Sequence, residues 1–561
     1  MGGLHPPAPI PGAGGAAGGK GAPMAVKIAV LSGYFIVMLI IGMIARTRWK
    51  STPESYFLAD RRLGPIVLLG TMAATNFSAF TVFGTSGAGY RDGYAFFPIM
   101  GFGTGFMAIT FWLLGRRVWE LGKTRGLITP SELVRSIYGS RLLSVLFACV
   151  LIVFTIPYLA LQPMAAGYAL EALVGLPYFQ GCLLVTGVIL LYTLRGGMRA
   201  VAWTDVFQGG LMVVLLVVSL VLVVTHHGGL AAANRKVLAA CPALFSRPGG
   251  LNYYTPAIWF SYMLLWFFCD PMFPQLFQRF FAARNPRSLR GTMLWYPLVC
   301  TVVFFPPVAI GILGRLSFPF LAGKEADRIL PMVITQISGE AMAALVITAG
   351  LAALMSTMDS QLLTLSSIFT RDIQPLVSRR EASGGVAGRL FVIFLSLCGL
   401  ALAYKPPATI LQIATETFTG LAVLFPTVVF SLYLKRVHPA PAIASILTGE
   451  SLLVAFHFQW IPSGSFLPVV WILLAAFGVY LVLHGLVLRQ PFSVPVWLRD
   501  PYFWMLASVF ALAMDFWAWG RIGPLVLGMP AWIGYFAMLS ILQTAVMWLW
   551  AKDTAKDGEK S

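Results

Sequence analysis

Apolar stretches of about twenty residues recur along almost the whole chain and are separated by short polar segments. An apolar run of about 17 to 25 residues forms a helix that is long enough to cross the hydrocarbon core of a bilayer. The pattern therefore predicts an all-α polytopic membrane protein. We expect fifteen helical segments, at residues 28–46, 64–86, 93–114, 142–174, 180–194, 200–225, 255–282, 291–314, 341–366, 388–404, 408–434, 440–457, 467–488, 501–518 and 530–551.

The composition agrees with this pattern. Of the 561 residues, 58% are hydrophobic and only 11% are charged, whereas soluble domains carry about 25% charged residues. The six cysteines are scattered and indicate no disulfide framework. Residues 1–24 are rich in Gly, Pro and Ala and are expected to form a disordered tail, and residues 552–561 a short cytoplasmic tail.

The distribution of Lys and Arg predicts the orientation, because these residues are enriched in cytoplasmic loops. With the N-terminus outside and the C-terminus in the cytoplasm, most of the 39 basic residues fall in inner segments. The net charge of +18 is then explained by the basic residues of the cytoplasmic loops. Nucleic-acid binding is the competing explanation, but the basic residues are spread over short loops and do not form one patch.

Several carboxylates lie inside predicted spans, among them Asp205, Asp270, Asp359 and Glu416. An ionisable group at membrane depth is costly and is functional by default, whereas a lone Ser or Thr usually bonds to a carbonyl of its own helix. Asp205 has a structural alternative as the partner of Arg199.

The stretch "GLAALMSTMDSQ" places small and hydroxyl-bearing residues at i, i+3, i+4 and i+7, so that they share one helical face. These are Ala353, Ser356, Thr357 and Ser360. Neutral oxygens of this kind suit a weakly held Na⁺, particularly if a broken partner helix adds free carbonyls. The Gly- and hydroxyl-rich segment 70–90 has the composition of such a broken helix.

A second broken helix is predicted at "WFFCDPMFPQLFQRFFAARN", where two prolines flank polar residues. Asp270 in this stretch has three competing interpretations. It could bind a substrate amine beside aromatic rings, it could titrate and couple protons, or it could cap the broken helix. Capping is favoured here because Pro271 follows at once.

Four motifs in this order resemble the sodium:solute symporter family: "LRGGMRAVAWTDVFQGG", "PMFPQLFQRFFAARNPRS", "AALMSTMDSQLLTLSS" and "FTGLAVLFP". The resemblance covers about residues 28 to 490. It implies the leucine-transporter-type fold, with a ten-helix inverted-repeat core in two five-helix halves. We expect these halves at about 64–225 and 255–434, within a symporter domain at 25–490, with one extra N-terminal helix, about four extra C-terminal helices and a two-helix extension at 491–551.

The resemblance also implies functional residues. The principal sodium site would be formed by the carbonyls of Ala74 and Phe77 together with Ala353, Ser356 and Thr357. A second sodium site would use Asp205, Ser356, Asp359 and Ser360, although Asp359 stands where members with this site have serine. The candidates for substrate binding are Asn76, Ser78, Thr81, Tyr158, Gln162, Asp270, Gln275 and Glu416.

The function that these features predict is sodium-coupled import of a small organic solute by alternating access across the plasma membrane. The substrate would be a monocarboxylate, pantothenate or an amino-acid-like compound. The resemblance implies that a sugar is disfavoured, because the family's sugar transporters have glutamine where Thr81 stands. It disfavours sialic acid as well, because that branch uses an arginine on the third core helix and 143–167 contains none. Na⁺ would be the coupling ion and the only metal, with no cofactor, no nucleic acid and no enzyme activity, in a monomer or loose oligomer.

Three other functions compete with this one. A proton-coupled transporter of the same fold differs only in its ion. A transporter-like membrane sensor would need a signalling region, which the ten residues after the last predicted helix do not provide. A membrane enzyme would need clustered acid–base groups or metal ligands, and the six histidines show no metal-binding spacing.

Overall fold

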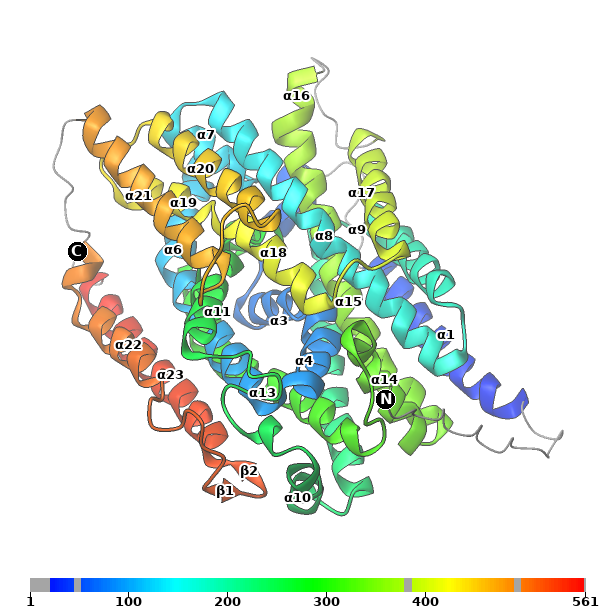
Figure 1. Cartoon of the computed structure of the whole chain (residues 1–561). Helices are drawn as coiled ribbons and strands as arrows, with labels where there is room; N and C mark the ends of the chain where they lie inside the picture. Colours follow the sequence, from blue (N-terminus) through cyan, green and yellow to red (C-terminus); the bar gives the residue numbers. More distant parts are fainter. Residues whose placement is uncertain (1–20, 45–51, 378–385, 489–495, 559–561) are drawn as a thin grey trace.

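A computed structural model describes residues 21–44, 52–377, 386–488 and 496–558 and consists almost entirely of helices (Figure 1). Helices occupy all fifteen predicted places, so the all-α membrane fold is confirmed. The predicted tail at 1–24 lies outside the described residues as far as residue 20, and the first helix begins at Gly21.

The N-terminal half of the chain contributes the following elements, in which short 3-10 or π-helical turns are labelled η. They are α1 (Gly21–Ile44), α2 (Pro53–Leu58), η1 (Ala59–Arg61), α3 (Pro65–Asn76), η2 (Phe80–Gly84), α4 (Thr85–Asp92), η3 (Gly93–Phe96), η4 (Ile99–Gly103), α5 (Thr104–Phe106), α6 (Ile109–Arg125), α7 (Pro130–Tyr138), α8 (Arg141–Val174), α9 (Tyr178–His226), α10 (Leu230–Ala240), η5 (Pro242–Phe245), α11 (Pro256–Cys269), η6 (Asp270–Met272) and α12 (Pro274–Ala282).

The rest of the chain adds further helices and one small two-stranded sheet. They are α13 (Pro286–Leu313), η7 (Gly314–Leu316), η8 (Gly323–Arg328), α14 (Ile329–Ile337), α15 (Glu340–Ile368), η9 (Phe369–Ile373), α16 (Gln374–Val377), α17 (Val386–Tyr404), α18 (Ile410–Ala422), α19 (Phe425–Tyr433), α20 (Pro439–His457), α21 (Pro468–Leu488), η10 (Val496–Arg499), α22 (Pro501–Leu512), the antiparallel strands β1 (Leu525–Val526) and β2 (Met529–Pro530), and α23 (Ala531–Gly558).

Eleven helices in the described residues are long and apolar enough to cross a membrane, or twelve with the bent pair at 65–96. Several predicted segments are therefore shorter or broken helices. The predicted spans 180–194 and 200–225 form one helix, α9, which kinks at Gly197. There φ is +67° and a Cβ atom would lie 2.9 Å from the Tyr56 carbonyl oxygen, so glycine is required for both reasons.

Two helices near the centre of the bundle are interrupted, as the sequence predicted. The chain bends by 61° between α3 and the following helical segment. The second break separates α11 from α12, where Phe273 is extended and Pro274 begins the next helix. Helix breaks release backbone N–H and C=O groups, which membrane proteins tolerate only where other polar groups are available. The two breaks therefore mark the place to look for a site.

The helices around these breaks pack with their backbones in close contact. Gly89 of α4 faces the Val308 carbonyl of α13, and Gly311 of α13 faces the Ser86 carbonyl of α4. A Cβ atom at either position would lie within 2.5 Å of that oxygen. Small residues allow such approach between membrane helices, so these two glycines hold the first broken helix firmly against α13.

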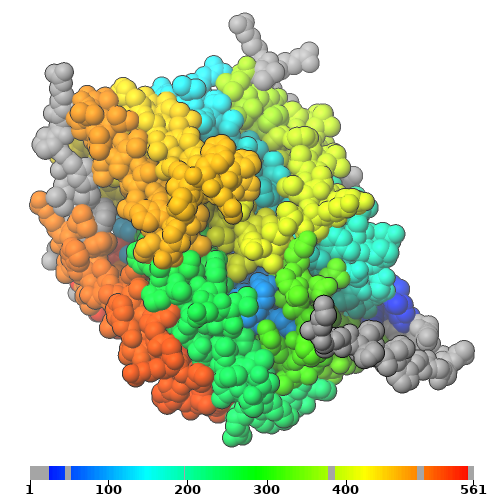
Figure 2. Space-filling view, in the orientation of Figure 1, coloured from blue at the N-terminus to red at the C-terminus, as the bar shows by residue number. Residues whose placement is uncertain are grey.

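The C-terminal extension, made of α22, α23 and the strands between them, packs along one side of the core (Figures 1 and 2). Its main anchor is a fully buried ion pair between Arg247, in the loop before α11, and Asp515, after α22. The Arg247 guanidinium also lies 3.9 Å from the centroid of the Trp519 ring. The extension contacts α5, α11 and α13, which surround the breaks, whereas α1 packs on α9 and α15.

We expect Asp515→Asn to destabilise the protein by about 3–5 kcal/mol, because Arg247 would stay buried without a counter-charge. The thermal midpoint of the detergent-solubilised protein, followed by size-exclusion chromatography, measures this loss. Asp553→Asn, which removes an exposed carboxylate from the same extension, is the matched control. Equal midpoints for both variants would contradict a structural role for the pair.

Candidate functional site

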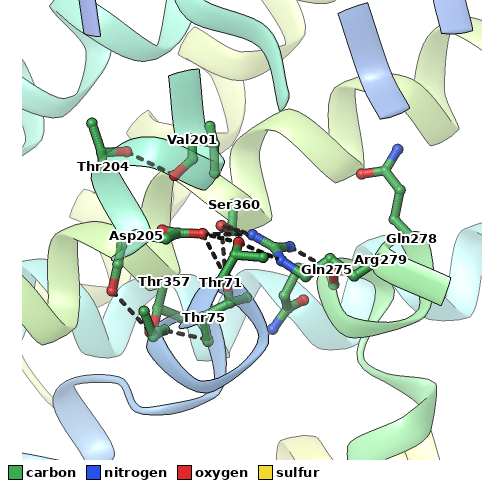
Figure 3. Close-up of polar contacts among 12 residues, drawn as sticks. Thr71, Thr75, Val201, Thr204, Asp205, Gln275, Gln278, Arg279, Thr357 and Ser360 are labelled. Atoms are coloured by element: carbon green, nitrogen blue, oxygen red, sulfur yellow. Dashed lines mark hydrogen bonds and ion pairs between the residues drawn. The ribbon is translucent and has the colours of Figure 1, made fainter. Parts of the chain in front are cut away.

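A buried polar cluster joins four helices beside the break in α3. The Asp205 carboxylate of α9 accepts hydrogen bonds from Thr71 and from Thr75, the latter at 3.1 Å, and it pairs with the Arg279 guanidinium of α12 at 2.8 Å (Figure 3). Arg279 also donates to Ser360 of α15 at 2.7 Å. Both charged side chains are fully buried. The cluster thus connects α3, α9, α12 and α15.

The partner of Asp205 differs from the one that the sequence suggested. Arg199, six residues earlier on α9, is exposed, and the ion pair is made instead by Arg279 from 74 residues further along the chain. The guanidinium is itself oriented by a bond from Nε to Thr71 at 2.9 Å and from Nη1 to the Gln275 carbonyl at 2.7 Å. Hydrogen bonds from Nε and from Nη1 therefore fix the orientation of the guanidinium.

The predicted sodium ligands come together one turn away, between α3 and α15. Ser356 Oγ lies 2.8 Å from the Ala74 carbonyl oxygen and 3.0 Å from that of Ala353. Thr357 Oγ1 lies 3.0 Å from the Thr75 carbonyl oxygen and 3.2 Å from that of Ala353. The arrangement gathers two hydroxyls and three carbonyls, all neutral oxygens of the kind that bind Na⁺.

The backbone carbonyls near the two hydroxyls are those of Ala74 and Thr75, whereas those of Ala74 and Phe77 were expected. In the described part of the chain, the two hydroxyls contact the carbonyls of Ala74 and Thr75 and make no contact with that of Phe77. Phe77 lies at the break itself, with extended backbone angles and its N–H bonded to the Ala73 carbonyl.

The Arg279 side chain fills part of the predicted second sodium site. Two of its four residues, Asp205 and Ser360, bind the Arg279 guanidinium. The third, Ser356, faces the first site. The fourth, Asp359, is fully buried, and neither of its oxygens has a hydrogen-bond partner in the described chain. A fixed positive charge therefore lies where a second cation was expected.

A narrow cavity of about 10 Å³, with room for about one water molecule, lies between the two helix breaks. Four of the predicted substrate-binding residues line it, namely Asn76, Thr81, Tyr158 and Asp270. The amide of Asn76, at the end of α3, donates to Asp270 Oδ2 at 3.2 Å and to the Tyr296 hydroxyl at 2.6 Å. The remaining lining residues are Phe80, Met100, Thr104, Trp266, Phe273, Phe304 and Phe418.

The other four predicted substrate residues lie elsewhere. Gln162 supports the first break, because its Oε1 accepts the Ala79 N–H at 3.1 Å, and Ser78 Oγ accepts the Phe80 N–H at 3.2 Å. Gln275 is buried beside Arg279, and neither amide atom has a partner in the described residues. Glu416 faces outward, with a side chain that is 64% exposed and 3.3 Å from His457.

Asp270 does not act as a helix cap in this structure. Its carboxylate oxygens accept from the Asn76 amide and from the Cys269 thiol, and among the described residues no backbone N–H donates to them. The backbone carbonyl of Asp270, not its side chain, accepts the Phe273 N–H. Of the three interpretations made from the sequence, capping is the one that the hydrogen bonds do not support.

Comparison with known proteins decides the family. The model of the sodium:solute symporter family matches residues 56–449, which is most of the chain. The chain belongs to this family. The match ends within α20, so the C-terminal extension lies outside the symporter family model.

Curated relatives of this symporter match over most of their length. The osmoregulated proline transporter OpuE of Bacillus subtilis is 28% identical, covering 83% of this chain and 94% of the relative. The sodium/pantothenate symporter of Escherichia coli is also 28% identical, covering 81% of this chain and 95% of the relative.

Solved structures show the fold of this symporter. A substrate-bound, outward-open Na⁺-coupled sialic acid symporter superposes with a TM-score of 0.68 at 18% identity and covers 84% of this chain and 98% of that one. Mhp1, a nucleobase-cation-symport-1 family transporter in a closed conformation, gives 0.55 at 13% identity and covers 78% and 95%. The leucine-transporter-type fold is thereby confirmed, and the division into two five-helix halves stays a prediction.

Sequence reasoning missed Arg279 and the aromatic residues of the cavity. Arg279 was assigned to an inner loop, because it lies near the end of a predicted span. A usable signal was present in "PQLFQR", where Gln275 and Arg279 are one helical turn apart on a helix already predicted to be broken. Trp266 was among the rings expected beside Asp270, but Phe80 and Phe418 carried no comparable signal, because aromatic residues are common throughout this chain.

We expect Asp205→Asn and Arg279→Gln each to destabilise this symporter by about 3–5 kcal/mol, since each leaves one buried charge unpaired. The double variant removes both charges and should regain much of the lost thermal stability in detergent. Arg199→Gln, an exposed arginine on α9, is the control and should behave like the parent. Additive losses in the double variant would show that the two charges do not interact.

Proposed function

We propose that this protein is a sodium-coupled secondary active symporter that imports a small organic solute across the plasma membrane. The observation that carries the proposal is the approach of the Ser356 hydroxyl to the Ala74 carbonyl and of the Thr357 hydroxyl to the Thr75 carbonyl, at the end of α3. Membership of the sodium:solute symporter family supports Na⁺ as the coupling ion. Transport needs no catalytic group, so no enzyme activity is proposed.

The mechanism we infer is alternating access with Na⁺ joining α3 to α15. The ion would replace the present hydrogen bonds between these helices with coordination bonds from the same oxygens. Because α3 ends at the cavity, fixing it also fixes Asn76, which lines that cavity. Binding of Na⁺ then favours binding of the solute, and by linkage the solute strengthens Na⁺ binding by the same factor.

We infer further that one Na⁺ accompanies each solute. The Arg279 guanidinium binds two of the residues expected at the second sodium site, so its charge stands in place of a second ion. An inward driving potential of about 100 mV supplies about 2.3 kcal/mol for each charge. One ion would then support roughly fiftyfold accumulation from the potential alone.

The orientation that we propose puts the N-terminus outside and the C-terminus in the cytoplasm, as the basic residues indicate. The start of α1 and the end of α23 lie at opposite ends of the molecule in Figure 1, which supports termini on opposite sides of the membrane.

We expect Ser356→Ala and Thr357→Ala each to raise the Na⁺ concentration for half-maximal uptake about tenfold, a loss of about 1.4 kcal/mol of ion binding. Uptake into proteoliposomes over a range of Na⁺ concentrations measures the shift. The control is Ser396→Ala on α17, because that buried hydroxyl bonds only to the Val392 carbonyl of its own helix. An unchanged Na⁺ dependence in both site variants would disprove the assignment.

Proton coupling is a second candidate, and one observation favours it. The buried cluster contains two carboxylates, Asp205 and Asp359, but Arg279 pairs with only one of them. An unpaired carboxylate at this depth needs a cation, and a proton requires the least space. Under this alternative, Asp359 would carry a proton during the cycle.

The number of ions moved for each solute separates the two candidates. In proteoliposomes we expect one ²²Na⁺ for each solute, with no solute-driven acidification of the lumen and the same ratio in Asp359→Asn. Acidification in the parent that disappears in Asp359→Asn would favour proton coupling. Two Na⁺ for each solute would contradict the role that we give to Arg279.

A further inference from the structure

The cavity between the two helix breaks combines one carboxylate with a wall of aromatic rings. Trp266 lies 5.4 Å from both Phe80 and Phe418, measured between ring centroids. Phe418 also contacts Tyr158 at 4.8 Å and Phe273 at 4.7 Å. All five rings line the same space as Asp270. Aromatic faces attract cations, and the attraction is stronger where water is excluded.

No positive group balances Asp270 within this space. Its oxygens accept only from a neutral amide and a thiol, and none of the described residues that line the cavity is Lys, Arg or His. The nearby arginine is already paired with Asp205. A buried carboxylate without a counter-charge is expensive, so Asp270 either takes up a proton or pairs with a cation, and a cation carried by the solute would complete the site.

The cavity is also lined by buried polar groups that have no hydrogen-bond partner in the described residues. The Thr81 and Thr104 hydroxyls and the Trp266 indole N–H are buried and have no hydrogen-bond partner in the described residues. All three line the cavity. Buried donors are almost always satisfied in native proteins, and three unsatisfied ones around a single cavity indicate a ligand with a hydrogen-bond acceptor.

We propose that the solute is a small molecule with a positively charged nitrogen that pairs with Asp270, and with an acceptor, such as a carboxylate, that takes the donors of Thr81, Thr104 and Trp266. This assignment rests on the proposed function, because it names the substrate class of the same site. At about 10 Å³ the cavity has room for about one water molecule, so its walls must move apart for the solute to enter. A monocarboxylate without an amine would meet Asp270 with no cation to offset the repulsion.

Pairs of solutes that differ only at the nitrogen test this directly. L-proline is compared with tetrahydrofuran-2-carboxylate, and glycine betaine with 3,3-dimethylbutyrate, because each second member keeps the shape and the carboxylate but lacks the positive charge. Lactate, pantothenate and glucose complete the panel. Binding to the purified full-length protein is measured as thermal stabilisation in Na⁺ and, separately, in K⁺.

We expect a nitrogen-bearing member to stabilise the parent in Na⁺, with its uncharged counterpart at least about thirtyfold weaker. In Asp270→Asn the preference for the charged member should disappear, whereas stabilisation by Na⁺ alone should persist. Glu325→Gln, in an exposed loop, is the matched control that removes a carboxylate away from the cavity.

Several results would overturn the proposal. Equal binding of both members of each pair, binding of lactate, pantothenate or glucose in preference to the charged solutes, or stabilisation of the parent by Na⁺ but by no charged solute would each do so. Loss of stabilisation by Na⁺ itself in the parent would instead count against sodium coupling. If Asp270→Asn fails to fold, the paired solutes on the parent still decide the outcome.

Discussion

The ion pair between Asp205 and Arg279 is the interaction on which the rest of the site depends. Removing two charges from water costs several kcal/mol for each ion, and the attraction between them repays this only with good geometry and further hydrogen bonds. Those bonds come from Thr71, Thr75 and Ser360, so the pair keeps its hydrogen-bond partners only while three partner helices surround α12. Separation of any of these helices exposes an unsatisfied charge.

The same helices carry the oxygens proposed for Na⁺. Ala74 lies next to Thr75 on α3, and Thr357 lies one turn before Ser360 on α15. The charge pair therefore holds two neutral binding surfaces at a fixed separation without taking part in ion binding.

The two interrupted helices place opposite requirements on the protein. Their free backbone groups need polar partners, and Gln162 and Ser78 provide them at the first break. Asp270 at the second break provides none, and it is this carboxylate that remains available to a solute. Backbone groups at the first break are thus bonded to side chains of the protein. At the second break the Asp270 carboxylate is free to bind a ligand.

Most of the fold could be predicted from the sequence, because helix length and apolar content are local properties. The face with Ser356 and Thr357 was equally accessible, since i, i+3 and i+4 spacing is local too. The pairing of Asp205 with Arg279 was not, because it joins residues 74 positions apart. The outward direction of Glu416 was missed for a related reason: a helix that carries polar residues on more than one side does not reveal which side meets its neighbours.

The anchor of the C-terminal extension has a consequence for biosynthesis. Arg247 is translated 268 residues before Asp515, the carboxylate that neutralises it. During synthesis the loop before α11 therefore waits, with an uncompensated guanidinium, until almost the last helix has emerged from the ribosome. A nascent chain that stops earlier would leave Arg247 beside Trp259 without the carboxylate that neutralises it.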